Sequence, residues 1–141
     1  MSLSRVTIYI TPDPELIIDV TGILGRAGVN GVAMTVQMQT AGDAIRFLVD
    51  QPNVALTALQ DAKHLAHLDQ VEAVEIDDSP GALSRLLQAI KAAGGQYDAL
   101  QVFPSGKDLY KAIVVMVSKG NALAGVLAQL DYRSVASTDL T

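Results

Sequence analysis

The chain has 141 residues, and half of them are hydrophobic, which is enough for a packed core and argues against a disordered protein. Its formal net charge of −5 argues against an electrostatic grip on nucleic acid or anionic lipid, so we expect neither partner. The absence of cysteine excludes disulfides, a thiol nucleophile and zinc–cysteine sites.

The N-terminal stretch, residues 1–15, lacks the pattern of a cleavable signal peptide. No apolar run approaches the roughly 20 residues that a membrane-spanning helix needs. We therefore expect a soluble, cytoplasmic protein.

Hydrophobic periodicity divides the first half of the chain into alternating strands and helices. The stretch 6–10 alternates in period 2, a helical stripe follows, and Gly28 is placed to end that helix. The predicted elements are strands at 6–10, 32–40, 44–50 and 66–71, and helices at about 16–27 and 52–65.

The second half repeats this order at a spacing of 66 residues. Aligning Pro14 with Pro80 brings Gly28 onto Gly94 and superimposes the apolar positions of the intervening helices. The predicted elements are strands at 72–77, 96–103, 109–117 and 132–137, and helices at 80–93 and 119–131.

Both halves read as βαββαβ. We therefore expect an α+β protein of two tandem ferredoxin-like units, residues 1–71 and 72–141. Each unit should have an antiparallel four-stranded sheet with two helices on one face.

The predicted strand at 109–117 is apolar on both faces. A sheet with helices on one side should present a polar opposite face to water, so either the other half or a second chain is expected to cover this one. The alternative is that a small protein simply exposes these aliphatic side chains. A homodimer is the oligomeric state that we predict.

The turn before the helix at 80–93 has more turn-forming residues than a helix start requires. Asp78 or Ser79 could cap the helix, Pro80 fits its first turn, and Gly81 would let a ligand approach the backbone. Free amide donors at a helix N-terminus suit a carboxylate, and Asp77 or Asp78 could meet an ammonium group. Plain capping of the helix is the alternative interpretation.

Three consecutive features resemble the ACT domain, a small regulatory module that binds amino acids. They are an apolar strand, the sequence Asp-x-Pro-Gly-x-Leu at Asp78–Leu83, and a helix that ends at a glycine. The resemblance covers the whole chain as two copies, and it implies an effector at an interface near the turn after the first strand. In the first copy the turn is Thr11–Leu16, with Glu15 in place of the glycine. Asn30 resembles the family's amide before the second strand, and Gln96 is its equivalent in the second copy.

The expected ligand-binding residues are Asp77, Asp78, Ser79, Pro80, Gly81, Ala82, Leu83, Asn30, Gln96, Thr11 and Asp13. Because each copy keeps one element better than the other, a composite site using the turn of one copy and the strand of the other, or of a second subunit, is a further hypothesis.

We therefore expect a regulatory protein that binds an amino acid, with no enzyme activity, cofactor or metal. The alternative is an interaction protein that keeps the fold without a ligand site. His64 and His67 are three residues apart, but no neighbouring cluster completes a metal site, so a structural role is the better interpretation. No nucleophile motif accompanies them.

Overall fold

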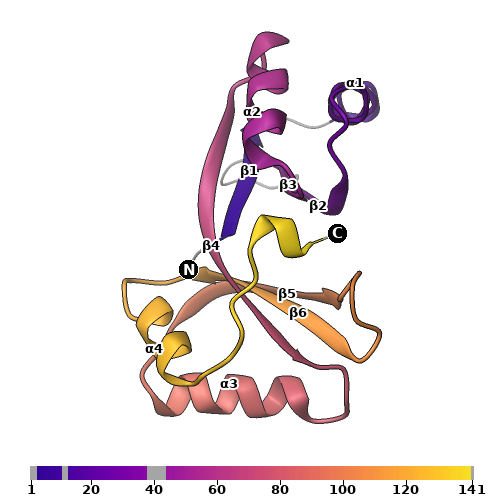
Figure 1. Ribbon diagram of the computed structural model, residues 1–141. Helices are drawn as coiled ribbons and strands as arrows, with labels where there is room; N and C mark the ends of the chain where they lie inside the picture. The colour runs from indigo at the N-terminus through magenta and orange to yellow at the C-terminus, as the bar shows by residue number, and fades with distance from the viewer. Residues whose placement is uncertain (1–2, 11–12, 38–43, 141) are drawn as a thin grey trace. The chain divides into compact units, whose positions relative to one another are not determined.

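The computed structural model describes residues 3–10, 13–37 and 44–140 (Figure 1). The chain forms two compact units, here called the first unit, Ser4–Asp69, and the second unit, Gln70–Leu140 together with Leu3. One long strand, β4 (Ala66–Asp77), begins in the first unit and ends in the second. The sequence had placed two separate strands, 66–71 and 72–77, in this region.

The first unit is a sheet with the strand order β2-β3-β1-β4. Strand β3 lies between β1 and β2 and pairs antiparallel with both, with Thr7 opposite Arg46 in the β1–β3 register. Its other elements are β1 (Leu3–Tyr9), α1 (Pro14–Arg26), β2 (Gly31–Gln37), β3 (Ala44–Val49) and α2 (Pro52–Asp61).

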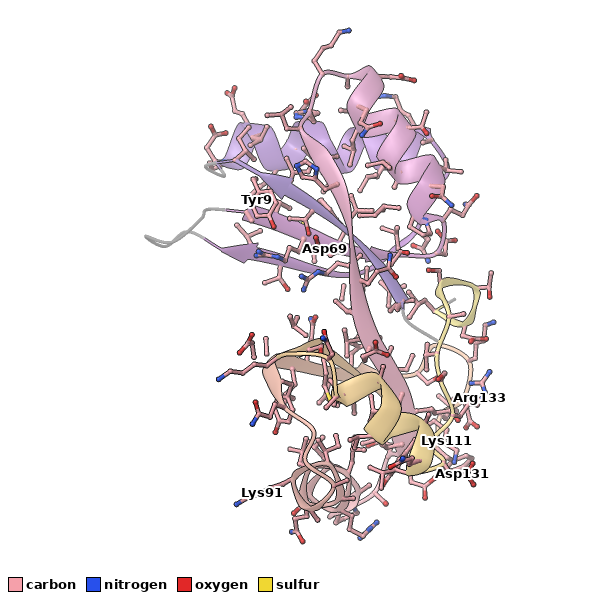
Figure 2. The ribbon with its side chains drawn as sticks, turned by 90° about the vertical axis from the view of Figure 1, so that its left-hand side faces the viewer. Tyr9, Asp69, Lys91, Lys111, Asp131 and Arg133 are labelled. Atoms are coloured by element: carbon pink, nitrogen blue, oxygen red, sulfur yellow. The ribbon has the colours of Figure 1, made fainter. Side chains whose placement is uncertain are left out.

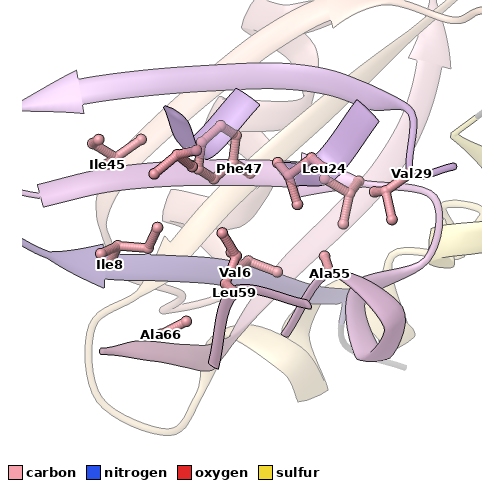
Figure 3. Close-up of a cluster of buried hydrophobic side chains, with 11 residues drawn as sticks. Val6, Ile8, Leu24, Val29, Ile45, Phe47, Ala55, Leu59 and Ala66 are labelled. Atoms are coloured by element: carbon pink, nitrogen blue, oxygen red, sulfur yellow. The ribbon is translucent and has the colours of Figure 1, made fainter. Parts of the chain in front are cut away.

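Alternate residues of these strands point to one face, which α1 and α2 cover. Figure 3 shows the resulting core, in which Val6 and Ile8 of β1 meet Leu24 of α1 and Leu59 of α2. All four side chains are buried. Burial of such side chains contributes about 1.5–3 kcal/mol each, so this face holds the unit together.

The second unit has the strand order β4-β6-β5, with both pairs antiparallel. Helices α3 and α4 lie on the same side of its sheet (Figure 1). Its core joins Leu86 and Ile90 of α3, Leu123 of α4 and Val114 of β6. Its elements after β4 are α3 (Ala82–Ala92), β5 (Tyr97–Pro104), β6 (Lys111–Ser118), α4 (Leu123–Gln129) and the 3₁₀ helix η1 (Ser137–Asp139).

The predicted α+β fold of βαββαβ type is confirmed, and the repeat extends to backbone conformation. Gly28 and Gly94, 66 residues apart, both have positive φ (74° and 84°) just after α1 and α3. Lys63 and Asp131 have positive φ just after α2 and α4. The corresponding helices of the two units therefore end in the same way, although only the first pair of positions holds glycine.

The predicted last strand, 132–137, is wrong. One antiparallel bridge joins Val74 to Ser134, with flanking hydrogen bonds between the backbones of 73–75 and 133–135. The chain then turns into η1, because the Asp139 carboxylate accepts a hydrogen bond from the Ala136 N–H at 2.9 Å. The fourth position of the second sheet is thus held by a short extended segment.

The two second helices are also shorter than predicted. Helix α2 ends at Asp61 instead of 65, just before the positive φ of Lys63. Helix α4 begins at Leu123 instead of 119, because Gly120 has a φ of 72° that a helix cannot contain.

The second face of β6 is covered by the chain itself. Ile113 and Val115 point away from the helix side, yet their side chains are 2% and 4% exposed. The apolar character of this face therefore does not require a second chain.

Candidate ligand-binding groove

The turn before α3 owes its glycine to backbone conformation. Gly81 has φ 85° and ψ −9°, and the N–H of Ala82 donates to the carbonyl of Ser79 at 3.2 Å. These values fit the third residue of a type II turn, where glycine follows proline. Gly81 is also the N-cap of α3, and no side chain caps that helix, so the predicted capping by Asp78 or Ser79 is wrong.

Asp77 lies on the sheet face opposite α3. Its neighbour Ile76 points into the core, and Lys111, which pairs with Asp77 in the register, forms an ion pair with its carboxylate. The hydrogen bond and charge of Lys111 lower the pKa of Asp77, and the same contact raises the pKa of Lys111. Asp77 is therefore already paired with an ammonium group within the chain.

The rest of the turn divides into exposed and core residues. Asp78, Ser79 and Pro80 are exposed, and the Asp78 N–H donates to the carbonyl of Tyr110 at 2.8 Å. Ala82 is 6% exposed and belongs to the core of the second unit.

The corresponding turn of the first unit is occupied by its own side chain. The Asp13 carboxylate caps α1 by accepting a hydrogen bond from the Leu16 N–H at 2.8 Å. Glu15 adds a second negative charge to the first turn. An anionic ligand would compete with both carboxylates there. Thr11 lies outside the described residues.

A groove of about 630 Å³ runs between α3 and the start of β5 in the second unit. Here we call it the α3–β5 groove. This volume falls within the range of small-molecule sites. Its lining residues are Leu83, Ser84, Leu87, Gln88, Lys91, Gly95, Gln96, Tyr97 and Lys119. Of the residues expected from the sequence to bind a ligand, Leu83 and Gln96 are in this set.

Helix α3 supplies one wall of the α3–β5 groove in two rows. Leu83, Leu87 and Lys91 are spaced four residues apart, so they share one helix face. Ser84 and Gln88 form the adjacent row, and the Gln88 Nε2 donates to the Ser84 Oγ at 2.9 Å. The wall is apolar along part of its length and polar beside it.

The opposite wall begins where α3 ends. Gly95 is buried, and a Cβ at this position would lie 2.8 Å from the Ile90 Cγ2, so only glycine allows this close approach to the helix. The carbonyl of Gln96 accepts a hydrogen bond from the Lys119 N–H at 3.0 Å. This bond brings Lys119 beside Gln96.

The first unit has an equivalent groove between α1 and β2, of about 290 Å³. It is lined by Thr21, Leu24, Gly25, Val29, Gly31, Val32, Ala33, Met34 and Phe47, none of which is charged. Asn30 is not among them: it is exposed, and its N–H donates to the Asp50 carboxylate at 3.0 Å. The two grooves are related by the repeat but differ in size and charge.

Sequence reasoning missed seven residues of the α3–β5 groove: Ser84, Leu87, Gln88, Lys91, Gly95, Tyr97 and Lys119. The row formed by Leu83, Leu87 and Lys91 could have been found, because a spacing of four marks one helix face. Lys119 follows strand β6, and nothing in its local sequence places it beside Gln96.

The two histidines have separate contacts in the first unit. The His64 Nε2 lies 3.0 Å from the Asp19 carboxylate, and the His67 ring packs against Tyr9 with centroids 5.6 Å apart. Among the described residues, no group of three or more His, Cys, Asp or Glu could hold a metal ion.

In the same part of the chain, no helix has the length and apolarity to cross a membrane.

No protein-family model and no curated protein matches the sequence. Among solved structures, the chain is similar to protein BT0572 from Bacteroides thetaiotaomicron, with a TM-score of 0.84 and 24% identity over 99% of this chain and 96% of that one. It is also similar to the ligand-free regulatory subunit of aspartate kinase from Thermus thermophilus, with a TM-score of 0.62 and 17% identity over 90% and 89% of the chains.

The chain has the ACT-like fold. The corresponding aspartate kinase subunit from Thermus flavus gives a TM-score of 0.57 at 15% identity, covering 89% of this chain and 88% of that one. The ACT-like chain therefore spans nearly the full length of these subunits. The resemblance stated from the turn and the repeat is confirmed at the level of the fold.

Proposed function

We propose that this chain is a regulatory protein of two tandem ACT-like domains, residues 1–71 and 72–141, that binds an amino acid without catalysing a reaction. The ligand site is the α3–β5 groove. Support comes from the fold, which is shared with chains described as regulatory subunits of aspartate kinase. Because one fold can host many functions, the proposal of a ligand rests on the residues of the groove.

The single observation behind it is the mixed lining of the α3–β5 groove. Leu83 and Leu87 offer an apolar surface for the carbon chain of a ligand. Gln96, Ser84 and Tyr97 offer hydrogen-bonding groups for its polar ends. A few polar groups on a mainly apolar surface are typical of small-molecule sites.

A thermal-shift screen of the twenty amino acids, alongside nucleotides and simple 2-oxo acids as alternative ligands, tests the proposal. A ligand present at a hundred times its dissociation constant stabilises the folded state by about 2.7 kcal/mol, which raises the melting temperature by several degrees. We expect such a shift with at least one amino acid. No shift with any amino acid would contradict the proposal.

A variant that fills the α3–β5 groove locates the site. Ser84→Tyr places a ring on the groove wall, and we expect it to abolish the amino-acid shift while the protein still folds. Ala128→Tyr is the matched control, because Ala128 is an exposed position of α4 that does not line the groove. A ligand shift that survives in Ser84→Tyr would place the site elsewhere.

An interaction protein without a ligand site is the second candidate. It is favoured by the first turn, where Asp13 satisfies the helix N-terminus, and by Asp77, which is paired with Lys111. If no small molecule binds, this candidate gains support.

We also propose that the protein is a homodimer. Strand β5 is the outer strand of its sheet, and Leu100 and Val102 on its helix side are 38% and 40% exposed. An unpaired edge beside exposed apolar side chains favours association with another chain. Light scattering tests this, and a mass of one chain at all concentrations would contradict it.

A cytoplasmic location stays a prediction.

A further inference from the structure

The charges along the α3–β5 groove have one sign. Lys91 and Lys119 are among its lining residues, and no aspartate or glutamate is. Lys91 projects from the last turn of α3 (Figure 2). The groove therefore presents two ammonium groups to a ligand.

These two ammonium groups are not engaged by the protein. Within residues 3–10, 13–37 and 44–140, neither Lys91 nor Lys119 has a side-chain hydrogen bond or ion pair. By contrast, Lys111 is paired with Asp77, and the Lys107 Nζ donates to the Thr138 carbonyl at 2.8 Å. Lys91 also complements the dipole at the end of α3, but Lys119 lies at no helix end and has no such role.

The charge of a ligand decides how well it suits this groove. A neutral amino acid brings one carboxylate and one ammonium group, so its ammonium group would lie near two lysines with no lining carboxylate to meet it. A ligand with more carboxylates than ammonium groups can pair with both lysines. Charge-assisted hydrogen bonds of this kind are stronger than neutral ones.

We propose that the α3–β5 groove selects a small dicarboxylate: an acidic amino acid or the corresponding 2-oxo acid. This inference rests on the proposed function. Leu83 and Leu87 contact its short carbon chain, and Lys91 and Lys119 bind its carboxylates. The first-unit groove, which has no charged lining residue, does not share this selectivity.

Calorimetric titrations with L-glutamate, L-glutamine and 2-oxoglutarate at low ionic strength test the selectivity. Glutamate and glutamine have nearly the same shape and differ by one charge, so their affinity ratio isolates the contribution of that charge. We expect glutamate to bind at least tenfold more tightly than glutamine. Equal affinities, or tighter binding of a neutral amino acid, would overturn the inference and leave the proposed function standing.

The 2-oxoglutarate titration can contradict the proposed amino-acid function while it supports the selectivity for dicarboxylates. Binding of 2-oxoglutarate without binding of any amino acid would overturn the amino-acid function and support the charge selectivity. If none of the three binds at millimolar concentration, and aspartate does not either, the inference fails.

Lysine variants connect the selectivity to the α3–β5 groove. Lys91→Met and Lys119→Met should each weaken glutamate binding about tenfold and bring the glutamate-to-glutamine ratio toward one. Lys63→Met is the control, since Lys63 is an exposed lysine of the first unit. An unchanged ratio in both groove variants would show that these lysines do not set the selectivity.

Discussion

Replacing Gly81 by alanine separates a conformational role of this glycine from a role in ligand binding. Gly81 has a φ of 85°, which is in the left-handed region. A Cβ there would lie 3.1 Å from the Arg85 Nη1, but this is the end of a flexible side chain that can move away. Backbone strain is therefore the main expected cost.

The strain has a calculable size. An L-residue in the left-handed region costs about 1–2 kcal/mol. Alanine also restricts the unfolded chain, which offsets about 0.4–1 kcal/mol. We expect Gly81→Ala to lower the free energy of unfolding by about 1 kcal/mol. Gly81→Asn should cost less, because asparagine adopts positive φ more readily.

Urea denaturation followed by circular dichroism measures this effect. With a slope of about 2 kcal/mol per molar urea, a loss of about 1 kcal/mol lowers the midpoint by about 0.5 M. An unchanged midpoint would refute the strain argument. An unchanged midpoint together with loss of ligand binding would instead support the interpretation from the sequence, in which Gly81 gives a ligand access to the backbone.

Three other predictions concern side chains whose environment is defined. Gly95→Ala should destabilise the protein by about 1–3 kcal/mol in the same urea assay, because its Cβ would lie 2.8 Å from the Ile90 Cγ2. Gly125→Ala in α4 should instead stabilise the protein by up to about 1 kcal/mol, because alanine favours a helix and open space surrounds this position. Asp13→Ala should cost about 1 kcal/mol through loss of the α1 cap, and Asp13→Asn much less; equal losses would contradict the capping role. A backbone N–H, with some help from Arg133, lowers the pKa of Asp139, so its contribution to stability is complete above the unfolded value of about 3.8 and is lost as pH falls through the lower folded value. Stability measured between pH 6 and pH 2 should therefore fall less steeply in Asp139→Asn, and an identical pH dependence would contradict this assignment.

The elements that rest on hydrophobic period were predictable from the sequence. Helix α3 carries Leu86 and Ile90 toward the core, on the face that periodicity indicates. The glycines at 28 and 94 mark equivalent helix ends in both halves. These features depend on local spacing, which the sequence contains.

Features that depend on backbone dihedrals or distant partners were not predictable in the same way. The positive φ of Lys63 ends α2 early at a residue type that does not signal a helix end. The last predicted strand fails because the Asp139 side chain turns the chain at Ala136. The strand was predicted because the second half repeats the order of the first, and nothing in the local sequence reveals this contact.

The candidate site was predictable only in part. Leu83 and Gln96, two of the residues expected from the sequence to bind a ligand, line the α3–β5 groove. The orientation of Asp77 could have been deduced, because strand alternation points it away from the face that Ile76 shares with the core. The position of Lys119 could not, since it depends on the pairing of β5 with β6.

The most direct test of the central claim is a titration of the isotope-labelled protein with L-glutamate, followed by amide NMR. We predict saturable shifts at amides of the α3–β5 groove, such as Ser84, Gly95 and Gln96, and little change at Val29 and Gly31 in the first-unit groove. Absence of shifts up to millimolar glutamate would contradict the predicted ligand class. If titrations with the other amino acids also leave these amides unchanged, the account of this protein as an amino-acid-binding regulator is wrong.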